Sequence, residues 1–502
     1  MIGTVLAASG PSVRLVQFLT ANRAEIARPE VVVRTAILSS ALLVALTLAW
    51  CAWSRRSPVT VGAGLGVLGL FFFTADIFGS DAVPRIGWFV VAVGLCVVAA
   101  ASAAQRTWVA ATVAAVAVGY VVTAGAGYAS WRDHRPGLAA VHTSDAVPTG
   151  TLPNVYYFVL DAYARDDVMS ALFPADDRTA FNDALTTLGF TVDEDATANY
   201  PQTDQSVPST LEQELIIDEW TPADEVRVDR SQMWKGDNTT VSDFRDLGYH
   251  YVHTENRRLD ALNCDSALAD ACLGPRTEST GVSLGEVERS LLEITPVGPI
   301  VLSGDIVDVA ENDVWPTDVV GGLIEDGWLT RDRPLFVYGH ILAPHPPYVR
   351  DGGCDEIEPV GDLGGGWGLE HRPYYLEQVQ CLRSELSRSL ERLVEADPTA
   401  IIVVQSDHGP AFDVDLLRPI DDWTDEMMRT RFGVFRSWRM PESCDPDDEA
   451  ASSLVNTFRV VGACVGAADP TLIDPQSYLI GYGSDAVEPL PPGLVPSAAR
   501  AG

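Results

Sequence analysis

The sequence predicts an N-terminal bundle of transmembrane helices followed by an α/β domain, whose mostly parallel sheet is covered by helices on both faces. Three observations predict this architecture. The first 130 residues contain long apolar segments, whereas the remainder of the chain is strongly polar. Beyond residue 152, short runs of β-branched and aromatic residues alternate with helical patterns. These runs are almost continuously apolar, which is typical of strands buried on both faces of a parallel sheet.

The N-terminal region, residues 1–130, is expected to cross a membrane several times. Four segments are apolar enough to span a bilayer, namely residues 36–53, 59–77, 86–104 and 108–130. A further segment near residues 1–19 is a weaker candidate, because it contains Pro11 and Arg14. The sequence alone does not decide between four and five membrane-spanning segments.

Arginines between the apolar segments predict how the chain is oriented. Arg55 and Arg56 separate the first two clear spans, and Arg106 separates the last two. Positively charged loops stay in the cytoplasm, so the chain after residue 130 should lie outside. We therefore expect a multi-pass protein of the cell membrane with an extracytoplasmic domain. Residues 131–152 should form a linker, residues 153–485 the extracytoplasmic α/β domain and residues 486–502 a flexible tail.

Charge and cysteine content agree with an exported domain. Residues 1–140 carry a net charge of +5, and the rest of the chain carries −40. Such a negative charge repels nucleic acid, so no nucleic-acid partner is expected. Six cysteines of the polar part are neighbours in sequence, which favours disulfides in an oxidising compartment: Cys264 with Cys272, Cys354 with Cys381, and Cys444 with Cys464. Reduced, buried thiols are the alternative.

Several elements of the polar part can be predicted from its patterns. Buried strands are expected at residues 155–160, 249–253, 335–340, 401–405 and 432–435, and amphipathic helices at 181–188 and 374–394. Ligands of such sheets gather at the carboxyl ends of the strands. Asp161 and Asp407 directly follow their strands, and His345 lies a few residues beyond its own.

The residues at two strand ends predict a metal site. Asp407, His408 and Gly409 follow four aliphatic residues and a Gln-Ser pair, and the glycine permits a tight turn that lets both side chains face one ion. Carboxylate oxygen with imidazole nitrogen suits Zn²⁺ or Mn²⁺ best, and Mg²⁺ is possible. Asp161 is the third candidate ligand, although an Asp in this position can also cap a helix.

A hydroxyl nucleophile is expected in the polar segment that ends at Pro208. Thr203, Ser206 and Ser209 all lie in or beside it. A free hydroxyl is a poor nucleophile, and coordination to a metal would activate it by lowering its pKa. Spacing alone does not decide among the three.

Three histidines are candidates for substrate binding. His345 lies within Pro-His-Pro-Pro, a stiff run that fixes where its imidazole points. His340 shares the phase of the apolar residues of its strand, and a hydrogen-bonded core histidine is the competing interpretation. His253, which follows Gly-Tyr-His-Tyr-Val, is the weakest of the three.

Taken in their order along the chain, Asp161, Thr203, His345 and the Asp407-His408 pair resemble the motifs of the alkaline phosphatase superfamily, in particular its membrane-anchored, sulfatase-like branch. That branch includes the lipoteichoic acid synthases and the phosphoethanolamine transferases. The resemblance covers roughly residues 150–485 by motif order and 1–485 by layout. It implies an alkaline phosphatase-like fold for the α/β domain.

The resemblance also implies roles for individual residues. Thr203 stands three residues before Ser-Val-Pro, as the catalytic threonine of phosphoethanolamine transferases does, which implies that it is the nucleophile and a metal ligand. Asp161, Asp407 and His408 match the remaining ligands of the family, and His345 matches its phosphate-contacting histidine. No histidine follows residue 408, so we expect a single metal ion.

The function implied is the transfer of a phospholipid headgroup, of phosphoglycerol or phosphoethanolamine type, through a phosphothreonine intermediate. The donor would be a membrane phospholipid, and the acceptor a glycan or lipid of the cell envelope. One alternative is a sulfatase or a phosphodiesterase-type hydrolase, although Thr210 stands where the sulfatase maturation motif needs arginine. The other alternative is a catalytically inactive binding protein of the envelope.

Overall fold

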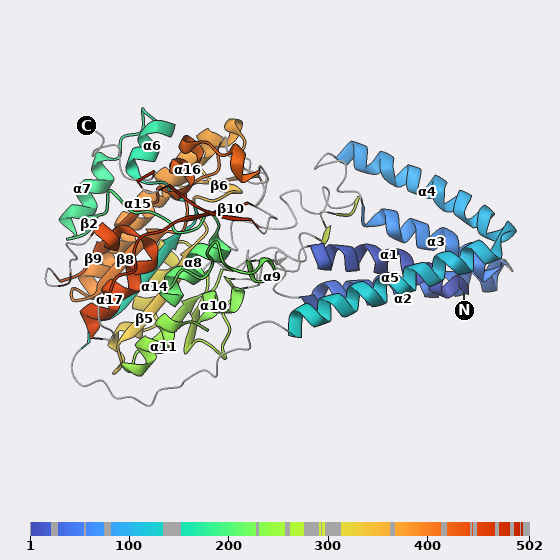
Figure 1. The fold of residues 1–502 in the computed structure, drawn as a ribbon, viewed down its shortest axis with the longest axis horizontal. Coiled ribbons are helices and arrows are strands. Elements are labelled where there is room, and N and C mark those ends of the chain that lie inside the picture. The colour runs from blue at the N-terminus through green and yellow to red at the C-terminus, as the bar shows by residue number, and fades with distance from the viewer. Residues whose placement is uncertain are drawn as a thin grey trace. The chain divides into compact units, whose positions relative to one another are not determined.

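The structure is a computed structural model that divides into two units (Figure 1). It describes residues 2–21, 29–54, 57–74, 82–133, 152–226, 230–256, 262–275, 291–292, 294–296, 313–361, 367–412, 419–441, 444, 449–466, 471–481, 486–491 and 493–494. The first unit comprises residues 1–137 and 280–308, and the second comprises 138–279 and 309–502. Arg55, Arg56 and most of the expected linker lie outside the described residues.

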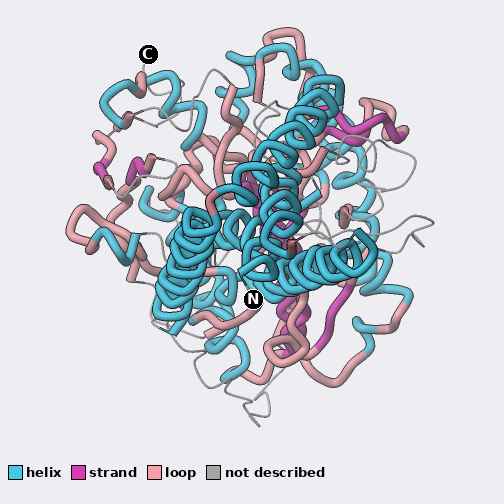
Figure 2. Tube along the Cα trace, turned by 90° about the vertical axis from the view of Figure 1, so that its right-hand side faces the viewer, coloured by secondary structure: helices cyan, strands magenta, loops and turns pink. Residues whose placement is uncertain are grey.

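Among the described residues, five helices belong to the first unit, and Figure 2 views them roughly along their axes. They are α1 (Ile2–Ala21), α2 (Pro29–Ser54), α3 (Pro58–Phe72), α4 (Ala82–Gln105) and α5 (Thr107–Asp133). Among the described residues, three stretches are long and apolar enough to cross a membrane, at residues 2–20, 31–53 and 107–127. The other two expected spans correspond to shorter apolar stretches, at residues 58–72 and 90–103.

Helix α1, the weak candidate at the sequence level, packs closely against α3. A Cβ atom on Gly62 of α3 would lie 1.9 Å from the carbonyl oxygen of Gly3, so only glycine permits this approach of the two backbones. Arg14, which counted against a span, donates from Nε to the carbonyl oxygen of Phe73, 2.8 Å away at the end of α3. Its polar group is therefore satisfied inside the bundle.

A seven-stranded sheet forms the centre of the second unit, in the order β2-β9-β8-β1-β5-β3-β4. Strands β8, β1, β5, β3 and β4 run parallel, and β9 is antiparallel to both β8 and β2. The strands of this sheet are β1 (Val155–Leu160), β2 (Thr191–Val192), β3 (His250–Thr254), β4 (Ala271–Leu273), β5 (Leu335–Ile341), β8 (Ile401–Ser406) and β9 (Arg436–Arg439). Two small antiparallel pairs join β6 (Tyr348–Arg350) to β7 (Glu356–Val360), and β10 (Tyr478–Ile480) to β11 (Val487–Pro489).

Helices cover both faces of this sheet, as the sequence predicts. Strand β1 shows why, since alternate residues enter different cores: Phe158 belongs to one and Tyr157 to the other. The first core is covered by α6 (Asp166–Leu172), α7 (Thr179–Thr187), α14 (Pro316–Glu325), α15 (Arg372–Ala396) and α16 (Asp425–Phe432). The second is covered by α8 (Thr203–Glu212), α10 (Ser231–Lys235), α11 (Thr239–Asp246) and α17 (Thr457–Val465). A short helix, α9 (Ala223–Val226), lies between α8 and α10 in the sequence.

Four of the five expected strands are confirmed within a residue, and the fifth is wrong. The apolar run at 432–435 is not a strand, because α16 ends at Phe432 and β9 begins at Arg436. Strand β9 escaped prediction since it carries the buried Arg436, whose charge is compensated by Asp193 of a distant segment. Sequence patterns do not reveal such a partner.

The three expected disulfides are confirmed in the second unit. Cys264 pairs with Cys272, Cys354 with Cys381, and Cys444 with Cys464. The second of them ties the β6–β7 hairpin to helix α15. All three belong to the unit that the sequence assigns to an oxidising compartment.

Candidate metal centre

The site forms where the neighbouring strands β8 and β1 end. Leu160, the last residue of β1, lies opposite Ser406, the last residue of β8. Parallel register therefore places the next residues, Asp161 and Asp407, side by side at the carboxyl edge of the sheet. Strand β5 flanks β1 on its other side.

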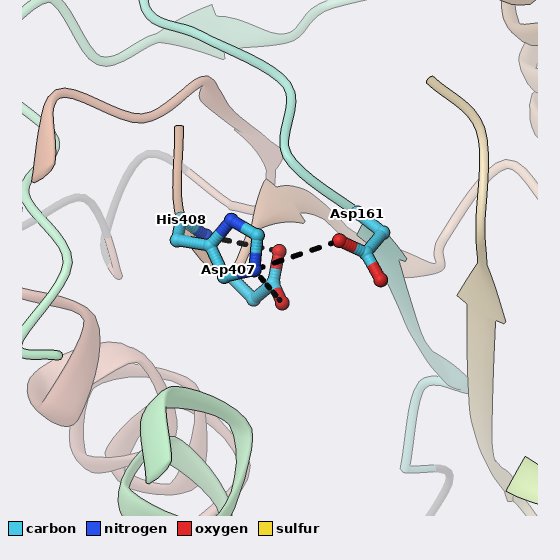
Figure 3. Close-up of side chains that lie close together, drawn as sticks. All are labelled: Asp161, Asp407 and His408. Atoms are coloured by element: carbon cyan, nitrogen blue, oxygen red, sulfur yellow. Dashed lines mark hydrogen bonds and ion pairs between the residues drawn. The ribbon is translucent and has the colours of Figure 1, made fainter. Parts of the chain in front are cut away.

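Asp161, Asp407 and His408 converge, as Figure 3 shows. One ligand atom from each lies within 4.8 Å of the others. His408 Nε2 is 3.6 Å from Asp161 Oδ1 and 3.4 Å from Asp407 Oδ2. All three side chains are almost completely buried, at 3%, 1% and 2% exposure. The predicted ligands are thus brought together by the fold.

Backbone groups orient the Asp-His pair. His408 Nδ1 lies 3.1 Å from the carbonyl oxygen of Gly409, and because a carbonyl only accepts, Nδ1 must carry the proton. In the neutral ring the lone pair then lies on Nε2, which faces the two carboxylates. Asp407 Oδ1 accepts from the amides of Ala162 and His408, at 3.2 and 2.9 Å. This leaves Asp407 Oδ2 turned toward the cluster.

Burial makes the electrostatics of the site unfavourable without a cation. Burial, together with the negative charge of Asp161, raises the pKa of the Asp407 carboxyl to about 7. Burial and the positive charge of Arg431 lower the pKa of the His408 imidazole well below its ordinary value. A neutral imidazole therefore cannot compensate the two neighbouring carboxylates.

These residues fit a divalent metal ion. Asp407 Oδ2 is buried and has no hydrogen-bond partner among the described residues, which is costly unless a cation binds it. Two carboxylates and an imidazole lone pair form a mixed oxygen and nitrogen donor set. Asp161, Asp407 and His408 would hold the ion, and Thr203 would contribute its hydroxyl.

Thr203 is the first residue of α8 and reaches the same cluster. Its Oγ1 lies 3.0 Å from His408 Nε2. Its side chain is partly exposed, unlike the buried carboxylates. The first turn of a helix carries positive potential, which favours an alkoxide over a hydroxyl. Thr203 is thus partly exposed and lies at the positive end of a helix.

The two rival hydroxyls point elsewhere. Ser206 is buried, and its Oγ donates to the carbonyl oxygen of Asp407 at 2.7 Å. Ser209 is also buried, and its Oγ donates to the carbonyl oxygen of Glu214. Both hydroxyl protons are committed to backbone carbonyls on the inner side of α8, so neither serine is placed to attack a substrate.

The three candidate histidines occupy different environments. His345 is partly exposed, its ring centroid 6.5 Å from that of His408 and 5.1 Å from that of Trp367. His340 is fully buried, with Nδ1 3.0 Å from the Tyr338 hydroxyl and Nε2 3.4 Å from Asp161 Oδ2. His340 therefore faces a candidate ligand from the interior, and of the three histidines only His345 is partly exposed.

His253 lies in the core of the sheet and away from this cluster. Its Nε2 donates to the carbonyl oxygen of Leu262, and its Nδ1 accepts from the Tyr251 hydroxyl, both at 3.0 Å. With both ring nitrogens engaged and no exposed surface, it has no atom left for a substrate. The expectation that His253 binds substrate is therefore not supported by its environment.

Two residues that support the site were not found from the sequence. Ala162 adopts a left-handed φ of 64° directly after Asp161, which turns the chain sharply at the end of β1. Tyr338 holds His340 from two positions earlier on the same face of β5. A Tyr-x-His pattern was the available signal for Tyr338, whereas no sequence signal marks a buried alanine with positive φ.

Comparisons with known proteins identify similar folds. No family model matches the chain, and no curated protein matches it by sequence. Among solved structures, it matches the integral membrane lipooligosaccharide phosphoethanolamine transferase A from Neisseria meningitidis, with 10% identity, 93% of this chain and 96% of that chain covered, and a TM-score of 0.42.

Two further solved structures match a smaller share of this chain. The C-terminal periplasmic domain of EcEptC from Escherichia coli matches with 14% identity over 70% of this chain and 96% of that chain, with a TM-score of 0.42. A protein in the alkaline phosphatase superfamily from Vibrio parahaemolyticus matches with 13% identity over 73% of this chain and 84% of that chain, with a TM-score of 0.44. These are likenesses of fold at low sequence identity.

Proposed function

We propose that this protein is a membrane-bound, metal-dependent phosphotransferase. It moves the headgroup of a membrane phospholipid, of phosphoglycerol or phosphoethanolamine type, onto a glycan or lipid of the cell envelope. Thr203 carries the group between the two half-reactions as a phosphothreonine ester. The single observation that carries this proposal is the hydroxyl of the partly exposed Thr203, 3.0 Å from His408 Nε2, at the edge of a buried Asp-Asp-His cluster.

The chain's own residues account for the first half-reaction. Thr203 Oγ1 attacks phosphorus, the bond between phosphorus and the diacylglycerol oxygen breaks, and diacylglycerol leaves as the alcohol after taking up a proton. The hydroxyl of Thr203 loses its proton in this step, and its place in the first turn of α8 stabilises the resulting charge. When bound by Asp161, Asp407 and His408, a divalent ion would supply Lewis-acid stabilisation to that oxygen.

His345 is the residue we assign to the phosphoryl group and its proton transfers. Its Nδ1 donates to the carbonyl oxygen of Pro346 at 2.8 Å, so Nε2 holds the lone pair of the neutral ring. Nε2 can therefore accept a proton from an attacking hydroxyl and, once protonated, return it to a leaving oxygen. In the second half-reaction, the acceptor hydroxyl attacks phosphorus, the bond to Thr203 Oγ1 breaks, and that oxygen regains its proton.

The position of Ser206 argues against a sulfatase. A sulfatase would convert a residue at this position to an aldehyde that reacts with substrate. The Ser206 side chain is instead 1% exposed and bonded to the backbone of Asp407. The Thr203 hydroxyl, three residues earlier, occupies the accessible position. A water molecule in place of the acceptor would make the same site a phosphodiesterase, and product analysis separates these two outcomes.

We further propose that the second unit lies outside the cytoplasmic membrane, where phospholipid headgroups and envelope acceptors are found. The three disulfides support this placement, because they persist in an oxidising compartment. Five spanning helices would also leave both arginine-bearing loops in the cytoplasm. Protease added to intact cells should remove the second unit, and its full protection would contradict this topology.

The deciding experiment is detection of phosphothreonine. Full-length protein in micelles with Mn²⁺ is incubated with membrane phospholipids, and peptides containing residue 203 are analysed by mass spectrometry. We expect a headgroup-phosphate adduct on Thr203, its absence in Thr203→Ala, and a turnover loss of roughly a thousandfold or more in that variant. Thr203→Ser should retain labelling. An active Thr203→Ala together with an inactive Ser206→Ala would refute the assignment.

A further inference from the structure

Arg431, in the last turn of α16, joins the two loops that carry the nucleophile and the ligand pair. Its side chain is buried, at 3% exposure. Its Nε donates to the carbonyl oxygen of Pro201 at 2.5 Å, and its Nη1 donates to that of Gly409 at 2.6 Å. Pro201 lies two residues before Thr203, and Gly409 directly follows His408. One guanidinium therefore bridges both halves of the site.

The backbone of α16 reinforces this bridge. The Gly409 amide donates to the carbonyl oxygen of Arg431 at 2.7 Å. A Cβ on Gly409 would lie only 1.9 Å from the carbonyl oxygen of Thr430, so the ligand loop rests directly on the helix end. On the nucleophile side, the amide of Ala198 donates to the carbonyl oxygen of Phe432 at 2.9 Å. Both loops thus share the last turn of α16 as a common support.

The geometry of a guanidinium suits this task. It is planar and rigid, and it presents donors in fixed directions, so it sets the separation of the two carbonyls that it binds. A lysine ammonium at the same position is a single point on a flexible stem and does not fix that separation. The distance between Thr203 Oγ1 and His408 Nε2 depends on this separation, because the two residues come from different loops. A displacement of about 1 Å can cost a factor of about 100 in rate.

We propose that Arg431 is a positioning residue that sets the distance between Thr203 Oγ1 and His408 Nε2 by holding the carbonyls of Pro201 and Gly409. The proposal rests on the proposed function for its catalytic consequence. Its structural content is independent of that function, since it concerns only how two loops are held apart. The two can therefore fail separately.

The test compares Arg431→Lys with Arg439→Lys in the full chain. Arg439 of β9 is the matched control, because it also clamps backbone carbonyls, those of Leu188, Ala400 and Pro398. We expect similar thermal stability for both variants. In Arg431→Lys alone, the Thr203–His408 separation in a crystal structure should exceed hydrogen-bonding reach, about 3.2 Å, and Mn²⁺ affinity should fall about 10- to 100-fold.

The outcomes are distinct. A crystal structure of Arg431→Lys that retains the 3.0 Å contact between Thr203 and His408 overturns the proposal. Equal Mn²⁺ affinity in Arg431→Lys and Arg439→Lys overturns it as well. If Arg431→Lys does not fold, Arg431→Gln, which can hold one carbonyl, takes its place. If neither folds while Arg439→Lys does, Arg431 is a core residue and the positioning role is refuted. Absence of phosphothreonine in the wild type, with the structural effect present, refutes the proposed function alone.

Discussion

Strands β5 and β3 are neighbours in the sheet and carry the same short pattern, yet their histidines differ in what they can do. Tyr338 holds His340 Nδ1 on β5, and Tyr251 holds His253 Nδ1 on β3, both at 3.0 Å. Burial lowers the pKa of both imidazoles to about 4, so both rings are neutral. The difference lies in the second nitrogen of each ring.

The place of each strand in the sheet accounts for the difference. His253 Nε2 donates to the carbonyl oxygen of Leu262, which closes its hydrogen bonding within the core. His340 lies opposite Val159 of β1, so its Nε2 faces the end of that strand and comes within 3.4 Å of Asp161 Oδ2. Among the described residues, His340 Nε2 has no hydrogen-bond partner. A buried histidine thus becomes a candidate site residue through its neighbouring strand and not through its local sequence.

The largest expected difference is between the Asp407 carboxylate at the metal centre and the Asp270 carboxylate beside β3. Asp407→Asn should abolish stoichiometric Mn²⁺ binding and lower turnover by about 100-fold or more, because the buried donor loses its charge. Asp270→Asn is the control beside β3, where Asp270 Oδ2 accepts from the Tyr251 amide at 2.8 Å. Titration calorimetry and turnover measurements on both variants check this expectation.

That prediction is contradicted if Asp407→Asn binds Mn²⁺ with wild-type affinity. It is also contradicted if Asp270→Asn loses Mn²⁺ binding to the same extent, since the loss would then not depend on a carboxylate of the cluster. Two metal ions per chain in the wild type would revise the expected single site.

Much of the metal centre could be predicted from the sequence, because it depends on strand ends. Asp161, Asp407 and His408 follow apolar runs that are unmistakable as buried strands, and parallel pairing brings such ends together. Thr203 could not be chosen over two serines from its own segment. Helix α8 begins there without a side-chain cap and continues through Pro208, which sequence reasoning takes as a stop.

Strand order is what the sequence could not supply. Nothing local to His253 reveals that β5 separates its strand from β1, so it was grouped with His340. The same limit applies to Arg14, whose partner Phe73 lies at the end of another helix. It applies to Arg436 as well, which is buried against Asp193. Local patterns predict elements, whereas the partners of buried charges depend on how those elements are arranged.

The matched pair of histidines provides a smaller effect. His340→Gln should weaken Mn²⁺ binding about 10-fold, because Asp161 loses the imidazole that faces it from the interior. His253→Gln should leave Mn²⁺ affinity unchanged, since among the described residues that ring is hydrogen-bonded to Tyr251 and Leu262, away from the cluster. Titration calorimetry on the two variants measures the difference. Equal weakening in both would show that the effect is a general loosening of the sheet.

The smallest expected effect is the contribution of His253 to the pH dependence of stability. The pKa of His253 is about 4 in the folded chain, below the ordinary value of 6.5, so between these values only the unfolded chain binds the proton. The folded state therefore loses stability as the pH falls through this window, by at most about 1.4 kcal/mol per pH unit for one group. His253→Gln should remove this contribution from the slope, in denaturant unfolding of the full chain in micelles with a chelator present.

His250→Gln is the control for this measurement, because His250 lies on the same strand with its side chain 32% exposed. Burial lowers its pKa as well, but water reaches part of the ring and its contribution to the slope should be smaller. An unchanged slope in His253→Gln would mean that His253 is protonated in the folded chain. Its Nδ1 would then have to donate to the Tyr251 hydroxyl, and the neutral core histidine on which the comparison with His340 depends would not exist.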